Sequence, residues 1–290
     1  MNKTFQDKYL SFIYSFAPLR MAMRLISNKT VSKIAGTFLS SGASAFLIKP
    51  FIRMHGIQMD DYEEKKYNSF NDFFIRRIRR GKRNVSMSEN VLVSPSDGFV
   101  SAYHINENSH FRIKGSTYST ASLIRNRKLA AAFSGGTCVA VRLCVTDYHH
   151  YIYADTAKVL KRFKIPGVLY TVNPAALEHE KVYKENAREY EVLASKNFGI
   201  MIQMEVGALM VGKIVNDCKE KYVKRGMEKG HFEFGGSTVI LLLKKNACVI
   251  RKEFFDAAMK NEEIRVNMGE NIGVKPGKAE IYNGYENIVS

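Results

Sequence analysis

Hydrophobic and polar residues follow two different patterns along this 290-residue chain. Between residues 5 and 57, leucine, isoleucine, phenylalanine and methionine recur every three or four positions among scattered lysines and arginines, a spacing that predicts amphipathic helices. Pro18 and Pro50 are expected to divide this stretch, because proline interrupts a helix. A basic amphipathic segment suits a membrane interface, but its apolar face can equally pack on the rest of the protein. The two roles are compatible if they fall on different faces.

A further helix is predicted where the sequence reads SFNDFFIRRIRRG, from residue 69 to 81. Ser69 and Asp72 have the spacing of a capping box, the phenylalanines form an apolar stripe, and Gly81 ends the helix. Six lysines and arginines crowd into residues 76–83. Most runs of this kind are solvated faces, and a minority form a patch that binds phosphate or lipid head groups.

From residue 91 onwards the pattern changes to short apolar runs separated by turn residues, which is typical of strands. One helix, at residues 120–133, interrupts them. Because the strands follow one another without regular intervening helices, an antiparallel sheet is favoured over a doubly wound parallel one. We therefore predict an α+β fold, with a helical, basic region at residues 1–84 and a mainly antiparallel β core at residues 85–290. The predicted strands are residues 91–93, 99–105, 111–113, 137–145, 159–165, 189–193, 200–206 and 238–243.

Charge is the unusual feature of an otherwise ordinary globular composition. Hydrophobic residues make up 46% of the chain, and 44 lysines and arginines against 28 acidic residues leave a formal net charge of +16. An excess of this size indicates a polyanionic partner, which can be nucleic acid or an anionic membrane surface. Composition alone does not choose between these two partners.

Cysteine usage and the chain ends bear on the compartment. The four cysteines show neither dense spacing nor C-x-x-C pairs, so we expect reduced thiols on the cytoplasmic side and no metal site. The first residues lack the apolar stretch of a secretory signal. No window approaches the roughly 18 uninterrupted apolar residues that a membrane span needs, so we expect none.

Three short segments carry residues that could do chemistry. The first, SPSDG at residues 94–98, is a tight turn that presents Asp97, and an aspartate in such a turn is most often structural. The second, TDYHHYIY at residues 146–153, follows an apolar strand. Its adjacent His149 and His150 point to opposite faces of an extended chain, so they are not paired metal ligands, although one of them could face a site.

The third segment reads KGHFEFGGSTVILLL and covers residues 229–243. Gly235 and Gly236 precede Ser237, and a strongly apolar strand follows. A hairpin turn with glycines at positive φ is the simpler interpretation. The alternative is a contorted backbone in which the Ser237 hydroxyl reaches back to the preceding carbonyl.

Taken together, these segments resemble the phosphatidylserine decarboxylases, pyruvoyl enzymes that cut themselves at a Gly-Ser bond. The resemblance extends over nearly the whole chain, and its motifs occur in the family's order. They are FNDFFIRR (70–77), SPSDG (94–98), TDYH (146–149), PGVLYTVNPAAL (166–177), NAREY (186–190), MEVGALMVGKI (204–214) and FEFGGSTVI (232–240).

The resemblance implies a cut between Gly236 and Ser237, which yields chains of residues 1–236 and 237–290. Ser237 would attack the Gly236 carbonyl and end as a covalent pyruvoyl group at the start of the shorter chain. That group would form a Schiff base with the amine of phosphatidylserine, so that carbon dioxide leaves and phosphatidylethanolamine is released. The resemblance calls for no metal and no external cofactor. Because a serine hydroxyl is a poor nucleophile, the family uses an Asp-His-Ser relay, to which Asp97 and Ser237 correspond.

The sequence departs from the family at the relay histidine. Members typically carry D-Y-H-x-x-H, and the second histidine belongs to the relay, but Ile152 stands at that position here. His149 is our choice for the missing base, because it keeps the place of the first histidine, and it is also the candidate acid that reprotonates the substrate. His150 could take over instead, Asp97 could act directly, or self-cleavage could be slow or absent. The alternative function is therefore a non-processing relative that binds anionic lipid without turnover.

The resemblance also assigns the positive charge a partner, an anionic membrane that contains phosphatidylserine. It implies a peripheral protein on the cytoplasmic side of the cell membrane, with residues 1–84 facing the lipid and residues 85–290 carrying the catalytic site. The long and short chains would stay partners of each other, and a homodimer is compatible with the family. A nucleic-acid partner is disfavoured, since no stacking-aromatic or zinc motif accompanies the charge.

Overall fold

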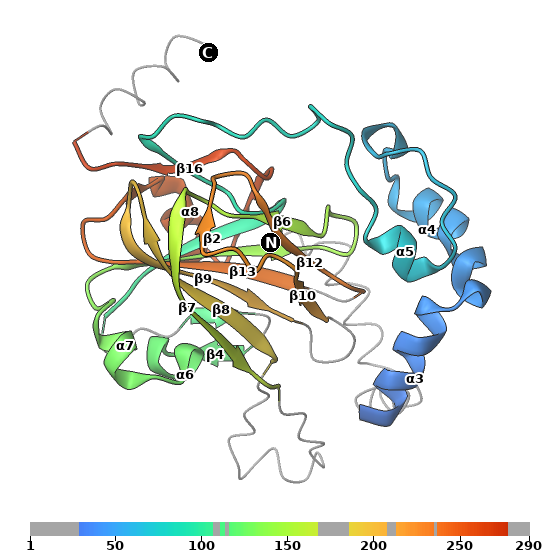
Figure 1. The fold of residues 1–290 in the computed structure, drawn as a ribbon, viewed down its shortest axis with the longest axis horizontal. Coiled ribbons are helices and arrows are strands. Elements are labelled where there is room, and N and C mark those ends of the chain that lie inside the picture. Colours follow the sequence, from blue (N-terminus) through green and yellow to red (C-terminus); the bar gives the residue numbers. More distant parts are fainter. Residues whose placement is uncertain are drawn as a thin grey trace.

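The computed structural model describes residues 29–106, 111–113, 116–167, 186–207, 213–234 and 237–277. Its N-terminal part is helical and lies together at one edge of the molecule, beside the β-sheet (Figure 1). The elements of this part are α3 (Lys29–Ser40), the 3-10 helix η1 (Gly42–Leu47), α4 (Ile48–His55), η2 (Met59–Asp61) and α5 (Phe70–Phe74). Pro50 lies in the first turn of α4, where its missing N–H is not needed, and Pro18 lies outside the described residues.

The N-terminal helices are held together by an apolar cluster around α5. Ile48 of α4 is buried with Phe70, Phe73 and Phe74, and the ring of Phe51 meets the Phe70 ring edge-on at 5.1 Å. The helices therefore pack one apolar face on the rest of the protein, which is one of the two roles predicted for the amphipathic stretch. Within the described residues, no helix combines the length and the apolar character needed to cross a bilayer.

An eight-stranded antiparallel sheet forms the body of the molecule. Its strand order is β11-β7-β8-β9-β13-β5-β2-β15, so that β13 is a central strand, flanked by β5 and β9. The strands are β2 (Gly98–His104), β5 (Thr137–Leu143), β7 (Ala157–Ile165), β8 (Arg188–Ser195), β9 (Gly199–Val206), β11 (Tyr222–Val223), β13 (Ser237–Leu243) and β15 (Ile264–Val266).

Smaller antiparallel sheets and three helices surround this body. One sheet has the order β1-β16-β14 (Val91–Val93, Asn271–Val274 and Val249–Ile250), and another has the order β10-β12-β6 (Ile214–Asn216, Glu228–Phe232 and His150–Ile152). The hairpin of β3 (Phe111–Ile113) and β4 (Ser116–Tyr118) lies near α6 (Thr120–Ile124) and α7 (Arg127–Ala131). Helix α8 (Lys252–Met259) packs against β2.

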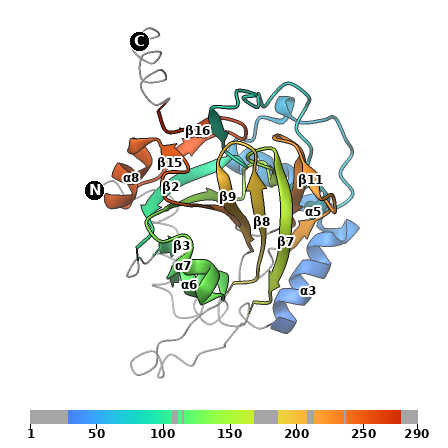
Figure 2. The ribbon, with the colours of Figure 1, turned by 60° about the vertical axis from the view of Figure 1, so that its left-hand side comes forward.

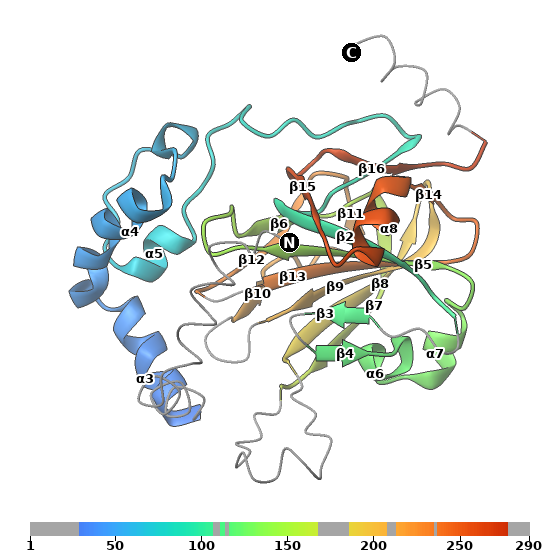
Figure 3. The same cartoon turned by 180° about the vertical axis from the view of Figure 1, so that it is seen from behind.

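The two faces of the large sheet bury separate apolar cores. Leu241 and Val139 point to the face covered by Phe254 of α8, whereas Ile240 and Leu242 point to the face covered by the β3–β4 hairpin, α6 and α7. Figures 2 and 3 show α8 and the α6–α7 pair on opposite sides of the sheet. Alternate residues of β13 thus serve different cores, which explains why all seven of its residues are buried.

These observations confirm the predicted α+β class, its antiparallel β core and its helical N-terminal part. Each predicted strand overlaps an observed one. The single helix predicted for residues 120–133 is wrong, because Arg125 adopts φ +53°, which ends α6, and the Asn126 side chain then caps α7. The helix predicted for residues 69–81 ends at Phe74, so the cationic run lies beyond it.

Candidate active site

Ser237 is the first residue of β13 and is fully buried. It pairs with Leu143 of β5, and the next residue, Thr238, is flanked by Arg142 of β5 and Val206 of β9. Gly235 and Gly236, directly before it, lie outside the described residues. The serine therefore begins a strand that is held on both sides.

Helix α5 holds the chain that leads to this glycine pair. The backbone N–H of Phe234 donates to Oδ1 of Asn71 at 3.0 Å, and the Phe234 ring meets the rings of Phe70 and Phe74 at 5.3 and 5.1 Å. The helix itself starts at a side-chain cap, because Ser69 Oγ accepts from the N–H of Asp72. The predicted Ser69 cap is thus confirmed.

His149 lies in the same neighbourhood and is fully buried. Its ring centroid is 3.8 Å from that of Phe74, and its carbonyl accepts from the N–H of Phe232 at 3.0 Å. Nδ1 of His149 lies 2.9 Å from the carbonyl oxygen of Asp147, so Nδ1 carries a hydrogen and donates it. In the neutral ring this leaves the lone pair on Nε2, which is the form that a base requires.

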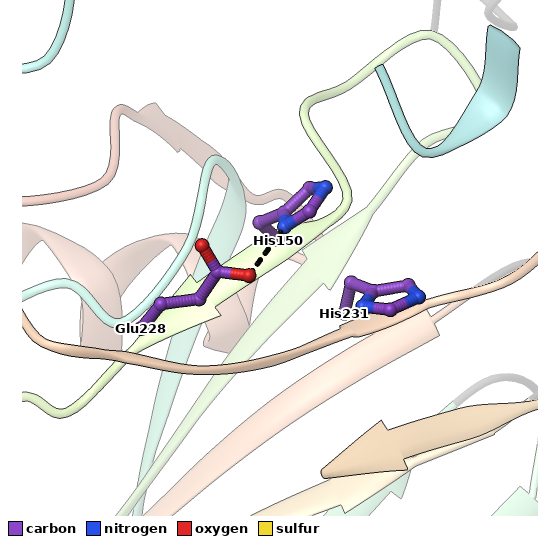
Figure 4. A group of neighbouring side chains, drawn as sticks. All are labelled: His150, Glu228 and His231. Carbon is purple, nitrogen blue, oxygen red and sulfur yellow. Dashed lines mark hydrogen bonds and ion pairs between the residues drawn. The ribbon is translucent and has the colours of Figure 1, made fainter. Parts of the chain in front are cut away.

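His150 faces different partners, as adjacent residues of an extended chain should. Its Nδ1 lies 2.9 Å from Oε1 of Glu228 (Figure 4). Its Nε2 lies 3.0 Å from the carbonyl oxygen of Ile75. Both ring nitrogens are thus occupied away from His149, which favours His149 over His150 as the base.

Asp97 is buried at the turn between β1 and β2 and accepts three hydrogen bonds. Arg83 donates to it from Nε at 2.7 Å and from Nη2 at 2.5 Å, and the N–H of Met268 donates at 2.8 Å. The bond to Asp97 raises the pKa of Arg83 against the cost of burial. A Cβ at the next residue, Gly98, would lie 2.5 Å from the carbonyl oxygen of Arg142, so only glycine allows this turn to approach β5.

Asp97 and Ser237 lie at the same end of the large sheet. Phe99 of β2 and Thr238 of β13 both pair with Arg142, one from each side of β5. Two strand spacings separate these backbones, which is on the order of 10 Å. The fold thus brings the turn that bears Asp97 to the end of the sheet where β13 begins.

Ile152, at the position of the usual relay histidine, lies in an apolar cluster beside this turn. It is buried with Tyr62, Tyr148 and Met268, and its N–H donates to the carbonyl oxygen of Pro95 at 2.8 Å. The apolar surroundings suit isoleucine. The charge of the nearby Asp97 is balanced by Arg83, a residue that the sequence did not single out.

The sequence profile of the phosphatidylserine decarboxylase family matches residues 70–274, from the first residue of α5 to the last residue of β16. This chain belongs to the phosphatidylserine decarboxylase family. A phosphatidylserine decarboxylase proenzyme 2 of Clostridium acetobutylicum is 41% identical over 272 residues, which cover 93% of each chain. Phosphatidylserine decarboxylase proenzymes of Clostridium kluyveri and Clostridium novyi are 41% and 39% identical, over 93% and 95% of each chain. The predicted resemblance to this family is confirmed.

The cationic run at residues 76–83, which begins within the family's FNDFFIRR segment, is largely engaged in contacts with the rest of the protein. Arg76 is buried and donates to the carbonyl oxygen of Thr146 at 2.7 Å and to the hydroxyl of Tyr62 at 3.2 Å. Arg76 and Arg83 are therefore internal ties, the first to the segment before His149 and the second to the Asp97 turn. Arg77, Arg80 and Lys82 stay exposed at the surface. The ion pairs of the run are Arg77 with Glu228, Arg79 with Glu64, Lys82 with Asp61 and Arg83 with Asp97.

A buried ion pair that involves Glu205, in the family's MEVGALMVGKI segment, had not been expected. Glu205 of β9 and Lys229 of β12 contact each other, both fully buried, and Nδ2 of Asn216 donates to Glu205 at 3.2 Å. Burial, only partly offset by Lys229, raises the pKa of Glu205 to about 7. Because Glu205 pairs with Val239, it shares a face of the sheet with Ser237 as a diagonal neighbour, about 7–8 Å away. The signal in the sequence was a carboxylate within a mainly apolar strand.

Proposed function

We propose that this chain is a precursor that cuts itself between Gly236 and Ser237, and that the processed protein decarboxylates phosphatidylserine to phosphatidylethanolamine. The observation that carries the proposal is the place of Ser237, buried at the first position of a central strand and directly after the glycine pair. The names of the relatives, which are phosphatidylserine decarboxylase proenzymes, agree with a precursor that is processed.

The proposed cleavage redistributes bonds around Ser237. Its Oγ bonds to the Gly236 carbonyl carbon while the peptide C–N bond breaks, and the freed nitrogen takes up the hydroxyl proton. Removal of the Ser237 α-hydrogen then breaks the Cβ–O bond and releases residues 1–236 with a carboxylate end. Water hydrolyses the remaining dehydroalanine, ammonia leaves, and the shorter chain, 237–290, begins with a pyruvoyl group.

The surroundings of Ser237 fit such a group. Within the described part of the chain, the buried Oε1 atom of Glu205 has no hydrogen-bond partner, and it belongs to the same face of the sheet as Ser237. A polar group formed at position 237 would therefore meet polar atoms rather than hydrocarbon alone. The pyruvoyl carbonyl supplies an electron sink that condenses with the amine of the substrate and accepts the electron pair as carbon dioxide leaves.

Three side chains are assigned to the chemistry. Ser237 is the nucleophile of the cut. His149 is the proton carrier, since its Nδ1–H is held by Asp147 and its Nε2 can accept and return a proton. Asp97 is the acidic member of the proposed relay, and its ion pair with Arg83 balances its charge within the site. No metal ion enters this chemistry.

A membrane surface is the proposed location of the reaction, on the cytoplasmic side and without a membrane span. Large apolar side chains are exposed on the N-terminal helices, with Phe46 68% and Met54 79% exposed, and the cations Lys49 and Arg53 are exposed beside them. Apolar side chains that enter the acyl boundary, next to cations that meet head groups, are the features of an interfacial helix. Residues 1–84 would thus form the lipid-facing region and residues 85–290 the catalytic one.

The test is the intact mass of the purified full-length chain after prolonged incubation, followed by an assay of phosphatidylethanolamine formation. We expect two masses, for residues 1–236 and 237–290, with a pyruvoyl group on the second. Ser237→Ala should remain one chain, and His149→Gln should cut about 10²–10⁴-fold more slowly, the usual contribution of a general base. The exposed His104 serves as a control, since His104→Ala should cut at the parent rate.

A single uncut mass would reject self-processing and favour the alternative, a family member that binds anionic lipid without turnover because Ile152 replaces the relay histidine. Ile152→His then discriminates further. If the cut appears only in that variant, the isoleucine is the cause of the missing cleavage.

A further inference from the structure

Three side chains with metal-ligating atoms come together outside the proposed catalytic residues. His150 of β6 pairs with His231 of β12, and Glu228 lies at the start of β12, so two neighbouring strands present all three side chains (Figure 4). One ligand atom from each of them lies within 4.8 Å of the other two. His150 is buried, and Glu228 and His231 are half-buried.

The type and spacing of these atoms suit a transition metal. Two imidazole nitrogens and one carboxylate oxygen form a common ligand set of zinc and of neighbouring first-row metals. Metal–ligand bonds of about 2.0–2.2 Å in a tetrahedral site place ligand atoms roughly 3.4 Å apart. Since Nδ1 of His150 and Oε1 of Glu228 are 2.9 Å apart, they need to separate only slightly to admit an ion.

The surrounding groups already orient these ligands. Nε2 of His150 donates to the carbonyl oxygen of Ile75 at 3.0 Å, which directs the other ring nitrogen, Nδ1, toward Glu228. Arg77 orients the carboxylate of Glu228, because it donates to Oε2 at 3.0 Å and, over a longer distance of 3.4 Å, to Oε1.

We propose that Nδ1 of His150, Oε1 of Glu228 and a ring nitrogen of His231 form a binding site for a divalent transition metal ion. The three side chains leave a fourth position for water. The ion would take the place of the direct contact between Nδ1 of His150 and Oε1 of Glu228. It would tie β6 to β12, a few residues before the glycine pair at the proposed cut, but its binding does not depend on whether the chain is cut.

Cobalt(II) is the probe of choice, because its visible absorption reports the number and type of its ligands. We expect the full-length protein to bind Co²⁺ with a tetrahedral-type visible spectrum, and Zn²⁺ to displace the cobalt in a calorimetric titration. His231→Ala and Glu228→Gln should each weaken binding at least tenfold. His104→Ala, at an exposed histidine outside the cluster, is the control and should leave binding unchanged.

A gain of signal guards against variants that merely misfold. His231→Cys keeps a ligand at this position, so its Co²⁺ complex should acquire a near-ultraviolet thiolate-to-metal charge-transfer band that the parent lacks. Cobalt binding that His231→Ala and Glu228→Gln leave unaltered would overturn the proposal. The absence of any tetrahedral-type spectrum, or of the new band in His231→Cys, would overturn it as well.

Discussion

At the scale of single residues, the partner of Asp97 is a guanidinium fourteen positions earlier in the chain. Asp97 and its position in a turn were predicted from the SPSDG segment, as were Ser237 and His149 as candidates. Arg83 was not, because the six cations of residues 76–83 look alike in the sequence. Only the tertiary path of the chain decides that Arg83 reaches Asp97 while Arg80 stays exposed.

Removing this partner should destabilise the fold. Arg83→Gln leaves the buried Asp97 carboxylate without its counter-charge, so we expect the free energy of unfolding to fall by about 3–5 kcal/mol. Urea denaturation, in a Ser237→Ala background that keeps the chain in one piece, measures the loss. Arg80→Gln is the matched control and should change stability by less than about 0.5 kcal/mol. Equal losses of unfolding free energy in the two variants would show that the contact with Asp97 does not stabilise the fold.

The raised pKa of Glu205 predicts a pH dependence of stability. Its pKa is about 7 when folded against 4.5 in the unfolded chain, so the native state holds the proton longer as the pH rises. The contribution of Glu205 to stability is therefore complete below about pH 4.5 and lost as the pH rises to about 7.

Glu205→Gln removes this titration while it keeps the shape of the side chain. The free energy of unfolding of the parent, relative to this variant, should fall by roughly 1–3 kcal/mol between pH 4.5 and 7.5. Denaturant titrations of both proteins at several pH values check the trend, again in the Ser237→Ala background. For Glu262→Gln, at an exposed glutamate, the free energy of unfolding should change with pH as it does in the parent. The same pH dependence in Glu205→Gln as in the parent would contradict the prediction.

At the scale of secondary structure, the long apolar strands could be predicted and the short polar ones could not. β13 and β5 are runs of buried apolar residues, so the sequence located both. β12 carries glutamate, lysine, glycine and histidine, and Glu228 and Lys229 form ion pairs, so that only Phe232 joins an apolar cluster and no apolar pattern marked the segment as a strand. The capped start of α5 was readable from Ser69, but its early end was not, because Ile75, the residue that ends it, is no typical helix stop.

Helix α5 should control how fast the proposed cut occurs. Asn71→Ala removes the acceptor for the Phe234 N–H, so the chain before the glycine pair loses one anchor. A net hydrogen bond of about 1 kcal/mol corresponds to roughly a fivefold slower cut. Time courses of intact mass measure the rate, and thermal unfolding checks that the fold persists.

Asn71→Asp offers the matched comparison at the same position, since it keeps the Oδ1 acceptor. It should cut close to the parent rate. If the alanine and aspartate variants slow the reaction equally, the Phe234 contact is not what positions the segment.

At the scale of the whole molecule, the N-terminal helices have two different faces. One face packs on α5, and the other exposes Ile34, Phe38, Phe46 and Met54. The sequence predicted amphipathic helices here, but it could not divide the apolar residues between protein and surroundings, because both uses follow the same spacing. Nor could it show that much of the positive charge at residues 76–83 is neutralised by ion pairs.

The exposed face predicts where the protein meets lipid. The double variant Phe46→Ser, Met54→Ser removes two side chains whose insertion is worth about 1.5–3 kcal/mol each when fully buried, so binding to vesicles that contain phosphatidylserine should weaken at least tenfold. Co-sedimentation with such vesicles measures the change. Met259→Ser, at an equally exposed methionine on α8, is the control. Unchanged binding of the double variant would place the lipid contact elsewhere on the molecule.

The central position of β13 has a consequence for the proposed products. A cut before Ser237 would leave β13 hydrogen-bonded between β5 and β9 of the long chain. The elements β14, α8, β15 and β16 would belong to the same short chain as β13. β16 would still pair with β1, and β15 with β2, both of which come from the long chain. The two products would therefore be interlocked pieces of one sheet system, which only global unfolding could pull apart. Breaking one peptide bond would create a new chain end deep inside the protein without creating a new surface.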